Sequence, residues 1–483
     1  MKLKWCFLLN QVDLLHEFLG RFAWQAVKEG DDCFLLANSR ISELSKRSLY
    51  PKQVRLYSKV DWCKKFYKPD IREPLETSWM VLFSEFGRPS YRRRVSSYKQ
   101  TQEIVVQLKQ FIEDVLGKER PDAVLSELPA NVFTQLVFRY CQLAGIRFVG
   151  LSDSRIPGSI DVYDLIHTCS RYEQTFRELD EKDITAEERM IAGRFLTDFL
   201  SHDVIPLYEK GKYNRSLMER LLLYMRRGKA ILPSWLKYFL VRSRIKVFDY
   251  ESEGVLVHTM KSPLAGLVRV IRAPFQWRLF EKPNTDEFFY LFPLQVQPEA
   301  STLVLAPSYE NFITTIKNVA FRLPFPAKLY VKEHPAFVGH RSASFYRELK
   351  AIPNVMLISP KSSTPELVQK CTGVIVLTST VGMESALAGK PTYVLGNVFY
   401  SYHPLCRQVR NFDELEERLR EDLSNPPSLA NVQELNTRFL VSYLRNTIAG
   451  SVVAASSDND TNDYKLIYKE IKRIFLDGKK NSI

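Results

Sequence analysis

The chain has 483 residues, of which 45% are hydrophobic and 25% charged, and 68 lysines and arginines against 55 acids give it a net charge of +13. This length fits two or three domains, and the composition excludes a disordered, collagen-like or low-complexity protein. No run of about eighteen apolar residues occurs, so no membrane-spanning helix is expected. The apolar stretch that follows Lys4 is too short for a signal peptide, which predicts a cytoplasmic protein. The excess of positive charge favours anionic partners: nucleotides, phosphorylated substrates, lipid head groups or nucleic acid.

The cysteines are scattered and odd in number, and none forms a CxxC pair. This pattern excludes the framework of a secreted disulfide protein and a cysteine zinc site. Most of them lie in apolar runs, which predicts buried thiols. They are Cys6, Cys33, Cys63, Cys141, Cys169, Cys371 and Cys406.

The first half of the chain alternates short apolar runs with amphipathic segments, which predicts a parallel sheet covered by helices on both faces. Residues 171–280 are mostly helical in pattern and are interpreted as an extension of this first domain. Residues 283–299 contain three prolines and are predicted to cross between domains. Strands are predicted at 3–9, 33–36, 54–57, 122–125 and 146–151, and helices at 12–29, 100–116 and 133–144.

The second half restarts the alternation and predicts a second doubly wound unit. Strands are expected at 302–305, 328–332, 355–358, 374–377 and 392–395, and helices at 311–321, 342–351, 365–370 and 381–388. Two such domains with a cleft between them have the layout of GT-B glycosyltransferases. The predicted fold is therefore α/β and GT-B-like, with two Rossmann-like domains facing a cleft. The expected boundaries are 1–285 for the acceptor-side domain, 286–450 for the nucleotide-sugar domain, and 451–483 for a polar loop and C-terminal helix.

A predicted strand ends in Thr378, Ser379 and Thr380, and a helix begins at once. The hydroxyls and the free N–H groups of a helix N-terminus form a natural phosphate site. Gly382 would let a ligand approach the backbone closely, and Glu384, one turn further, could accept hydrogen bonds from ribose hydroxyls. Alternatively, Ser379 or Thr380 only caps the helix and Glu384 is a solvated helix residue.

Another predicted strand ends in Lys332, Glu333, His334 and Pro335. A histidine at the carboxyl end of such a strand faces the ligand crevice of a doubly wound sheet. Its imidazole can donate to a phosphate oxygen or act as a general acid near neutral pH. Alternatively, His334 is a hydrogen-bonded loop residue. The loops after both strands should open on the same edge of the sheet.

Residues 292–301, 332–335 and 378–396 with Phe399-Tyr400 resemble the bacterial capsule polysaccharide biosynthesis family, which includes Kdo transferases of the GT-B type. The His-Pro pair and the Ser/Thr pair are also similar to motifs of bacterial sialyl- and polysialyltransferases. This resemblance implies that the loop of Lys332, His334 and Pro335 contacts the CMP part of a CMP-sugar, and that the hydroxyl loop holds its phosphate. Many relatives have Gly at the position of Ser379.

A glycosyl acceptor must lose a proton as the sugar is transferred, and a carboxylate of the facing domain commonly takes it. Glu127 and Asp153 each follow a predicted strand of the first domain, which places both at the cleft edge. Glu127 is slightly preferred as the base, although either residue could be a helix cap or a surface charge. Arg155 could neutralise a substrate carboxylate or phosphate, or could lie on the surface.

No metal is required by this interpretation, and no metal site is predicted. Asp458-Asn459-Asp460 has the form of a DxD motif, but it lies in a polar stretch with no apolar strand before it, which indicates a solvated loop. Residues 212–246 combine ten lysines and arginines with aromatic and aliphatic side chains. They predict a helix on an anionic membrane surface, and the alternatives are helices with a solvated basic face or a surface for an anionic glycan.

The sequence therefore predicts a glycosyltransferase of bacterial surface polysaccharide assembly that carries a sugar, Kdo or another CMP-activated sugar, from a nucleotide-sugar to a glycan or glycolipid. No cofactor besides the donor and no nucleic-acid partner are expected. The predicted location is the cytoplasm, peripheral to the inner face of the membrane. A UDP-sugar epimerase of the same architecture and a non-catalytic glycan-binding protein are the alternatives.

Overall fold

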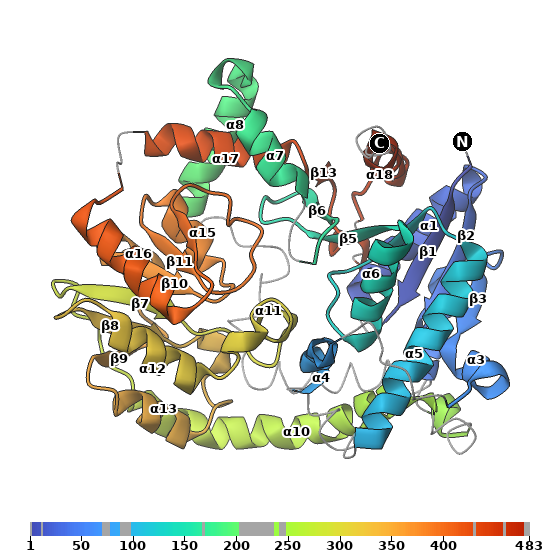
Figure 1. Cartoon of the computed structure of the whole chain (residues 1–483), viewed down its shortest axis with the longest axis horizontal. Helices are drawn as coiled ribbons and strands as arrows, with labels where there is room; N and C mark the ends of the chain where they lie inside the picture. The colour runs from blue at the N-terminus through green and yellow to red at the C-terminus, as the bar shows by residue number, and fades with distance from the viewer. Residues whose placement is uncertain are drawn as a thin grey trace.

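A computed structural model of the chain describes residues 2–10, 13–69, 78–86, 98–166, 170–201, 236–240, 248–427, 431–456 and 460–477. Two α/β units lie beside each other, and each is built on its own sheet (Figure 1). The mixed α/β class and the two Rossmann-like sheets predicted from the sequence are confirmed.

The first sheet has seven strands in the order β13-β6-β5-β4-β1-β2-β3. The strands from β3 to β5 run parallel, and β6 and β13 add an antiparallel edge. Their bounds are β1 Lys4–Leu9, β2 Asp32–Ala37, β3 Arg55–Ser58, β4 Ala123–Ser126, β5 Arg147–Asp153, β6 Ser159–Tyr163 and β13 Ile448–Ala449. The strand order reverses between β1 and β4, which is where a doubly wound sheet opens a crevice.

The second sheet has six parallel strands in the order β12-β11-β10-β7-β8-β9. Their bounds are β7 Phe289–Pro293, β8 Lys328–Lys332, β9 Val355–Ile358, β10 Gly373–Val376, β11 Thr392–Val394 and β12 Cys406–Gln408. The order reverses between β7 and β10, so both predicted ligand loops, after β8 and β10, open at the carboxyl edge near this point.

Amphipathic helices cover both sheets because their apolar stripes pack on the strands. In the first unit, for example, Phe22 of α1 packs edge-on against Trp5 of β1, with 5.6 Å between ring centroids. The helices around the first sheet are α1 Asp13–Lys28, α2 Arg40–Lys46, α3 Lys59–Phe66, α4 Phe83–Phe86, α5 Tyr98–Glu119 and α6 Val132–Ala144. Those around the second are α11 Ala300–Leu303, α12 Phe312–Arg322, α13 Ala343–Lys350, α14 Thr364–Lys370, α15 Val381–Leu387, α16 Phe412–Ser424 and α17 Val432–Leu444.

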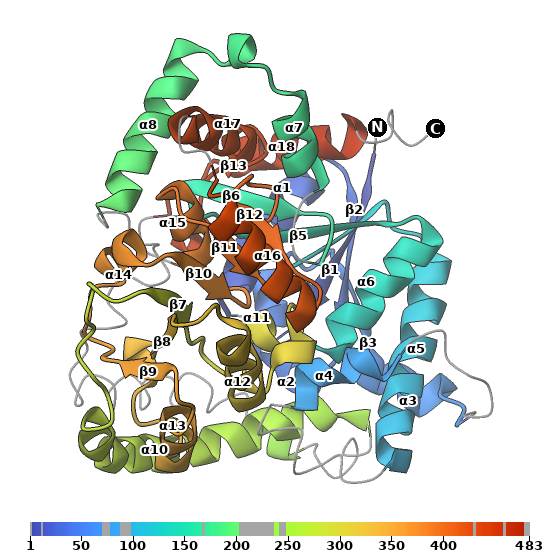
Figure 2. The same ribbon diagram turned by 60° about the vertical axis from the view of Figure 1, so that its left-hand side comes forward.

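Two connections tie the units together. Helix α10, Tyr250–Trp277, runs along one side of both (Figures 1 and 2). The C-terminal segment returns to the first unit, where β13 joins the sheet and α18, Tyr464–Asp477, packs on α1. Helices α7, Ser170–Glu178, and α8, Ala186–Leu200, which the sequence analysis groups with the first unit, pack instead on α17 and the second core.

Two expected features around residue 300 are wrong. The segment predicted to cross between domains contains the central strand β7, whose five residues are all buried. Its continuous apolar run has no alternation, as is usual in a parallel sheet, and the surrounding prolines hid that signal. The strand predicted at 302–305 is the helical turn α11 and its end, because the Glu299 carbonyl accepts from the N–H groups of Thr302 and Leu303.

Six of the seven cysteines are free and buried, as predicted, and Cys169 lies outside the described residues. Among the helices described, none is long and apolar enough to cross a bilayer. Most of residues 212–246 also lies outside the described part of the chain, so its membrane role stays a prediction.

Candidate functional site

A cavity of about 400 Å³ opens where the carboxyl edges of the two sheets meet. Glu127, Asp153 and Arg155 line it from the first unit, and Thr378 and Thr380 line it from the second. The predicted acceptor-side carboxylates and the predicted hydroxyl loop therefore share one cavity.

Thr378 is held in place by hydrogen bonds to Gln295 and Ser301, which follow the neighbouring strand β7. Its hydroxyl donates to the Ser301 carbonyl at 2.8 Å and accepts from Gln295 Nε2 at 2.8 Å, and its N–H donates to Gln295 Oε1. Gln295 follows β7, so these bonds clamp the loops at the point where the strand order reverses. Sequence reasoning included Gln295 only within the 292–301 motif and assigned it no role.

The side-chain hydroxyls of Ser379 and Thr380, which follow Thr378, make different contacts. Ser379 Oγ accepts from the Val381 N–H at 3.3 Å, so Ser379 partly serves the capping role that was its alternative. Thr380 is the N-cap residue of α15, yet its side chain makes no capping hydrogen bond. Because Thr380 also lines the cavity, its hydroxyl is the better placed of the two to meet a ligand.

Gly382 does not face the cavity. A Cβ at this position would lie 2.4 Å from the Tyr400 hydroxyl oxygen and 3.0 Å from its Cζ, and Tyr400 donates to the Ser379 carbonyl. The glycine is therefore needed for the close packing of α15 on Tyr400. This reason differs from the expected close approach of a ligand.

We expect Gly382→Ala to destabilise the fold by about 1–3 kcal/mol, because the added methyl overpacks a tight contact. Chemical denaturation measures this change in the free energy of unfolding. Adding Tyr400→Phe removes the closest oxygen, so the double variant should regain part of the loss. A Gly382→Ala protein as stable as wild type would contradict this account of the contact.

Lys332, His334 and Glu384 are not among the residues that line this cavity, although the Lys332 charge acts on both of the others. Burial, and to a lesser extent the nearby Lys332 ammonium, lowers the pKa of His334 to about 4. Burial also lowers the pKa of Lys332 to about 8, against the charges of Glu333 and Glu384. At pH 7 the imidazole is therefore a neutral hydrogen-bond donor and Lys332 remains mostly a cation. An anion bound between them would raise the His334 pKa toward the range of a general acid.

The His334 loop rests on a buried ion pair that the sequence analysis did not identify. Glu333 is 1% exposed. Its Oε1 accepts from the His334 N–H at 2.7 Å, and its Oε2 accepts from Arg341 Nε and the Tyr346 hydroxyl, both at 2.8 Å. Arg341 also donates to the Gln295 carbonyl, so it links the histidine loop to the Gln295–Thr378 clamp. Pro335 begins the short turn that follows, and it is exposed.

The carboxylates of Glu127 and Asp153 make different contacts. Asp153 accepts from the N–H groups of Val452 and Val453, one with each oxygen, at 2.6 and 3.1 Å. It therefore holds the returning C-terminal segment. Glu127 Oε1 accepts from Asn10 Nδ2 at 2.9 Å, a side-chain contact that leaves the carboxylate at the cavity wall.

Asp161 and Tyr163 of β6 also line the cavity. Asp161 is fully buried on β6, and its carboxylate accepts from the hydroxyls of Tyr443, Tyr163 and Tyr172 at 2.8–3.1 Å. Burial raises the pKa of Asp161. Tyr443 belongs to α17, so this contact joins the edge of the first sheet to the second unit. No motif in the sequence marks Asp161, because its partners come from distant segments.

In the described ranges, no group of three or more His, Cys, Asp or Glu side chains is placed to hold a metal ion. Asp458 and Asn459 of the DxD-like segment lie outside those ranges. Asp460 accepts from the Tyr464 hydroxyl and pairs with Arg21, so it anchors the start of α18.

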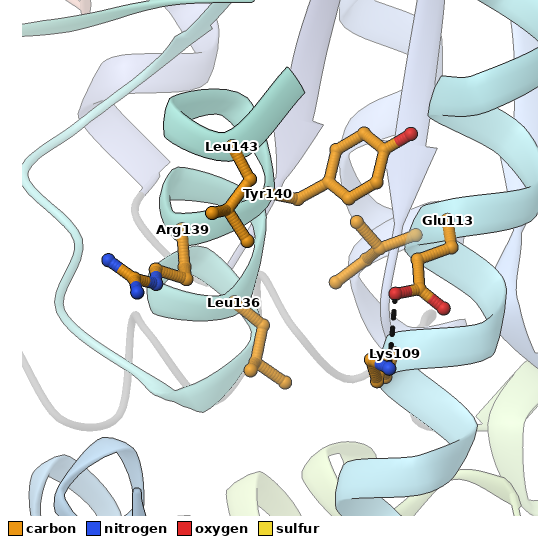
Figure 3. A pocket seen from close by; sticks show the side chains of 7 residues that line it. Lys109, Glu113, Leu136, Arg139, Tyr140 and Leu143 are labelled. Atoms are coloured by element: carbon orange, nitrogen blue, oxygen red, sulfur yellow. Dashed lines mark ion pairs between the residues drawn. The ribbon is translucent and has the colours of Figure 1, made fainter. Parts of the chain in front are cut away.

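A second hollow lies between α5 and α6, on the outer side of the first sheet (Figure 3). Its volume is only about 50 Å³, and Leu136, Tyr140 and Leu143 line it beside a Lys109–Glu113 ion pair. It lies away from the carboxyl edges of the sheets and brings together none of the predicted site residues.

Comparison with known proteins supports the motif-based resemblance. Residues 269–443 match the family model described as capsule polysaccharide biosynthesis protein, so the resemblance is confirmed over this segment. No curated protein sequence matches the chain.

Solved structures with similar folds include two transferases of Thermosulfurimonas dismutans KpsC. The beta Kdo 2,7 transferase is 15% identical, with a TM-score of 0.33, over 76% of this chain and 89% of that one. The beta Kdo 2,4 transferase is 13% identical, with a TM-score of 0.37, over 73% and 88%. The UDP-GlcNAc 2-epimerase of Neisseria meningitidis is 13% identical, with a TM-score of 0.27, over 98% and 100%.

Proposed function

Because residues 269–443 match the capsule polysaccharide biosynthesis family, we propose that this chain is a glycosyltransferase that builds a surface polysaccharide from a nucleotide-sugar. The observation that carries the proposal is the shared cavity: a carboxylate of the first unit faces the hydroxyl loop of the second. An acceptor hydroxyl and a donor phosphate would meet between these two walls. A CMP-sugar, with Kdo as one candidate sugar, is the proposed donor, and a glycan or glycolipid is the proposed acceptor.

The second unit would hold the donor. Lys332 would meet the phosphate as a cation, and the neutral His334 would donate an N–H to it. Hydroxyls of Thr380 and Ser379 would bind further phosphate oxygens as charge develops on the leaving group, which is the stabilisation that preorganised donors supply. Glu384 would accept from the ribose hydroxyls. In this proposal these groups take the place of a metal ion.

The first unit would act on the acceptor. Glu127 would accept the proton of the attacking hydroxyl as its oxygen bonds to the anomeric carbon and the nucleotide leaves with the electron pair of the broken bond. Arg155, which also lines the cavity, would balance negative charge on either substrate. Asp153 is proposed only to hold the C-terminal segment, because both of its oxygens already bind the backbone.

Thermal shift with CMP, CDP, UDP, GDP and their sugars tests the donor site. We expect one nucleotide series to raise the melting temperature, since a ligand at about 100 times its Kd stabilises by about 2.7 kcal/mol. His334→Ala should lose most of that rise. His340→Ala is the matched control. His340 belongs to the same loop, and its exposed imidazole stacks on Phe337.

No rise with any nucleotide, or an equal rise in both variants, would contradict the donor assignment. Turnover of the donor without a glycan acceptor would instead favour the epimerase alternative. Full function after replacement of His334 and Glu384 together would favour a non-catalytic glycan-binding protein.

A further inference from the structure

The hydroxyl loop ends in Thr380, whose polar groups are available to a ligand. Thr380 lines the cavity, and its side chain makes no capping hydrogen bond. None of the described residues accepts a hydrogen bond from its backbone N–H. Thr380 therefore offers two donors at one point of the cavity wall, a hydroxyl and a peptide N–H. Their directions depend on how the peptide between Ser379 and Thr380 is held.

That peptide is held through the Ser379 carbonyl oxygen, which accepts two hydrogen bonds. The Gly382 N–H donates to it at 3.0 Å, and the Tyr400 hydroxyl donates to it as well. A carbonyl oxygen has two lone pairs, so both of its acceptor positions are used. Because a peptide is planar and trans, the N–H of Thr380 points away from this carbonyl. Fixing the Ser379 carbonyl therefore fixes the direction of the Thr380 N–H.

Tyr400 is itself held by contacts that reach both units. It is 1% exposed, and its ring meets that of Phe399 edge-on, with 5.2 Å between the ring centroids. Phe399 stacks on Tyr443, with 5.4 Å between the centroids. The Tyr443 hydroxyl donates to Asp161 at 2.8 Å and accepts from the N–H of Arg155 at 3.3 Å, both in the first unit. The ring of Tyr400 is therefore anchored independently of its own hydroxyl.

The Tyr400 hydroxyl is a permanent donor. Burial raises the pKa of this phenol well above its usual value, and the charges of Arg155 and Glu384 act on it in opposite directions. The phenol therefore keeps its proton at neutral pH. Since the Ser379 carbonyl can only accept, the proton of Tyr400 is directed to that oxygen.

We infer that Tyr400 is a positioning residue for the donor phosphate: its hydroxyl holds the Ser379 carbonyl so that the N–H and the hydroxyl of Thr380 are presented to the cavity. The inference rests on the proposed binding of the phosphate by the hydroxyl loop. Donors that are already in place stabilise an anion because they need no reorientation when it binds. Without the bond to Tyr400 the peptide is freer to rotate, and a rotated peptide offers the anion a carbonyl in place of a donor.

Tyr400→Phe tests this role because it removes only the hydroxyl. The aromatic ring keeps its contact with Phe399, so the local packing is retained. Tyr309→Phe is the matched control. The Tyr309 hydroxyl also donates to a backbone carbonyl of the second unit, that of Arg410 at 2.8 Å, but Tyr309 is not among the residues that line the cavity.

The first measurement compares the affinity of a nucleotide with that of its nucleoside, which lacks the phosphate. The probes are CMP and cytidine, or the corresponding pair if the thermal-shift panel selects another base, and calorimetry measures their binding. Tyr400→Phe should weaken the nucleotide about tenfold, the size expected for one hydrogen bond, and leave the nucleoside unchanged. Tyr309→Phe should change neither. An equal loss for nucleotide and nucleoside would show a merely structural role and overturn the inference, as would an unchanged nucleotide affinity.

The second measurement needs no ligand, so it separates the inference from the proposed function. Crystal structures of the wild type and of Tyr400→Phe are compared at the peptide between Ser379 and Thr380. We expect this peptide to be rotated, or to occupy two orientations, in the variant, with the aromatic ring in place. A peptide with one unchanged orientation would overturn the inference. A wild type that binds no nucleotide would instead overturn the proposed function, and with it the phosphate as the ligand, but not the hold of Tyr400 on the loop.

Discussion

Replacing Glu127 with glutamine is expected to lower the rate of sugar transfer by about 10²–10⁴-fold, because the amide cannot accept the acceptor proton. The substitution keeps the shape of the side chain and an oxygen that can accept from Asn10. Nucleotide affinity should stay unchanged, since the residues proposed to bind the donor belong to the other unit. Steady-state transfer assays and nucleotide binding measured on the same preparation check both statements.

Asp153→Asn is the control for this prediction. Asparagine keeps one oxygen acceptor, so one of the N–H groups of Val452 and Val453 loses its partner. The expected cost is about 1–3 kcal/mol of stability, with the transfer rate per folded molecule close to that of wild type. If Asp153→Asn removed activity in a fully folded protein while Glu127→Gln retained it, the base would be Asp153.

The sequence was sufficient to predict those strands and loops that depend on a local pattern of residues. The strands 328–332 and 355–358 coincide with β8 and β9, because short apolar runs between helical segments carry enough signal. The two ligand loops were also placed on one edge, since parallel strands share their carboxyl ends. Strand β7 was missed because it has only five residues, ends in Pro293 and lies between Pro283 and Pro298, and prolines usually indicate loops.

What the sequence could not provide is contact between distant segments. Asp153 and Glu127 looked equivalent after their strands, and only the return of residues 452–453 distinguishes them. Gly382 looked like a ligand contact until Tyr400 filled the space beside it. Asn10 donates to Glu127, which is more than one hundred residues away in the chain. Such partners follow from the packing of the whole fold.

Replacing Arg341 with methionine is expected to destabilise the second unit by about 3–5 kcal/mol, which is typical when one member of a buried ion pair is removed. The Glu333 and Arg341 side chains are 0% and 8% exposed, so water cannot replace the lost partner. The guanidinium also lies 4.8 Å from the ring centroids of Phe312, Phe337 and Phe345, and methionine would retain part of this packing. Denaturant unfolding measures the loss.

The pH dependence of this loss tests its electrostatic cause. Burial raises the pKa of Glu333, and the attraction of Arg341 acts in the opposite direction. A carboxyl whose pKa is higher in the folded state binds more protons there, so stability falls as pH rises from the unfolded pKa to the folded one. Without Arg341 the folded pKa rises further, and the fall should be steeper and extend to higher pH. The loss of stability in Arg341→Met should therefore shrink on acidification.

Adding Glu333→Gln to Arg341→Met should recover part of this loss at neutral pH, because no buried charge then remains. A loss of stability that is equal at all pH values, and unchanged by Glu333→Gln, would show that Arg341 acts through packing alone.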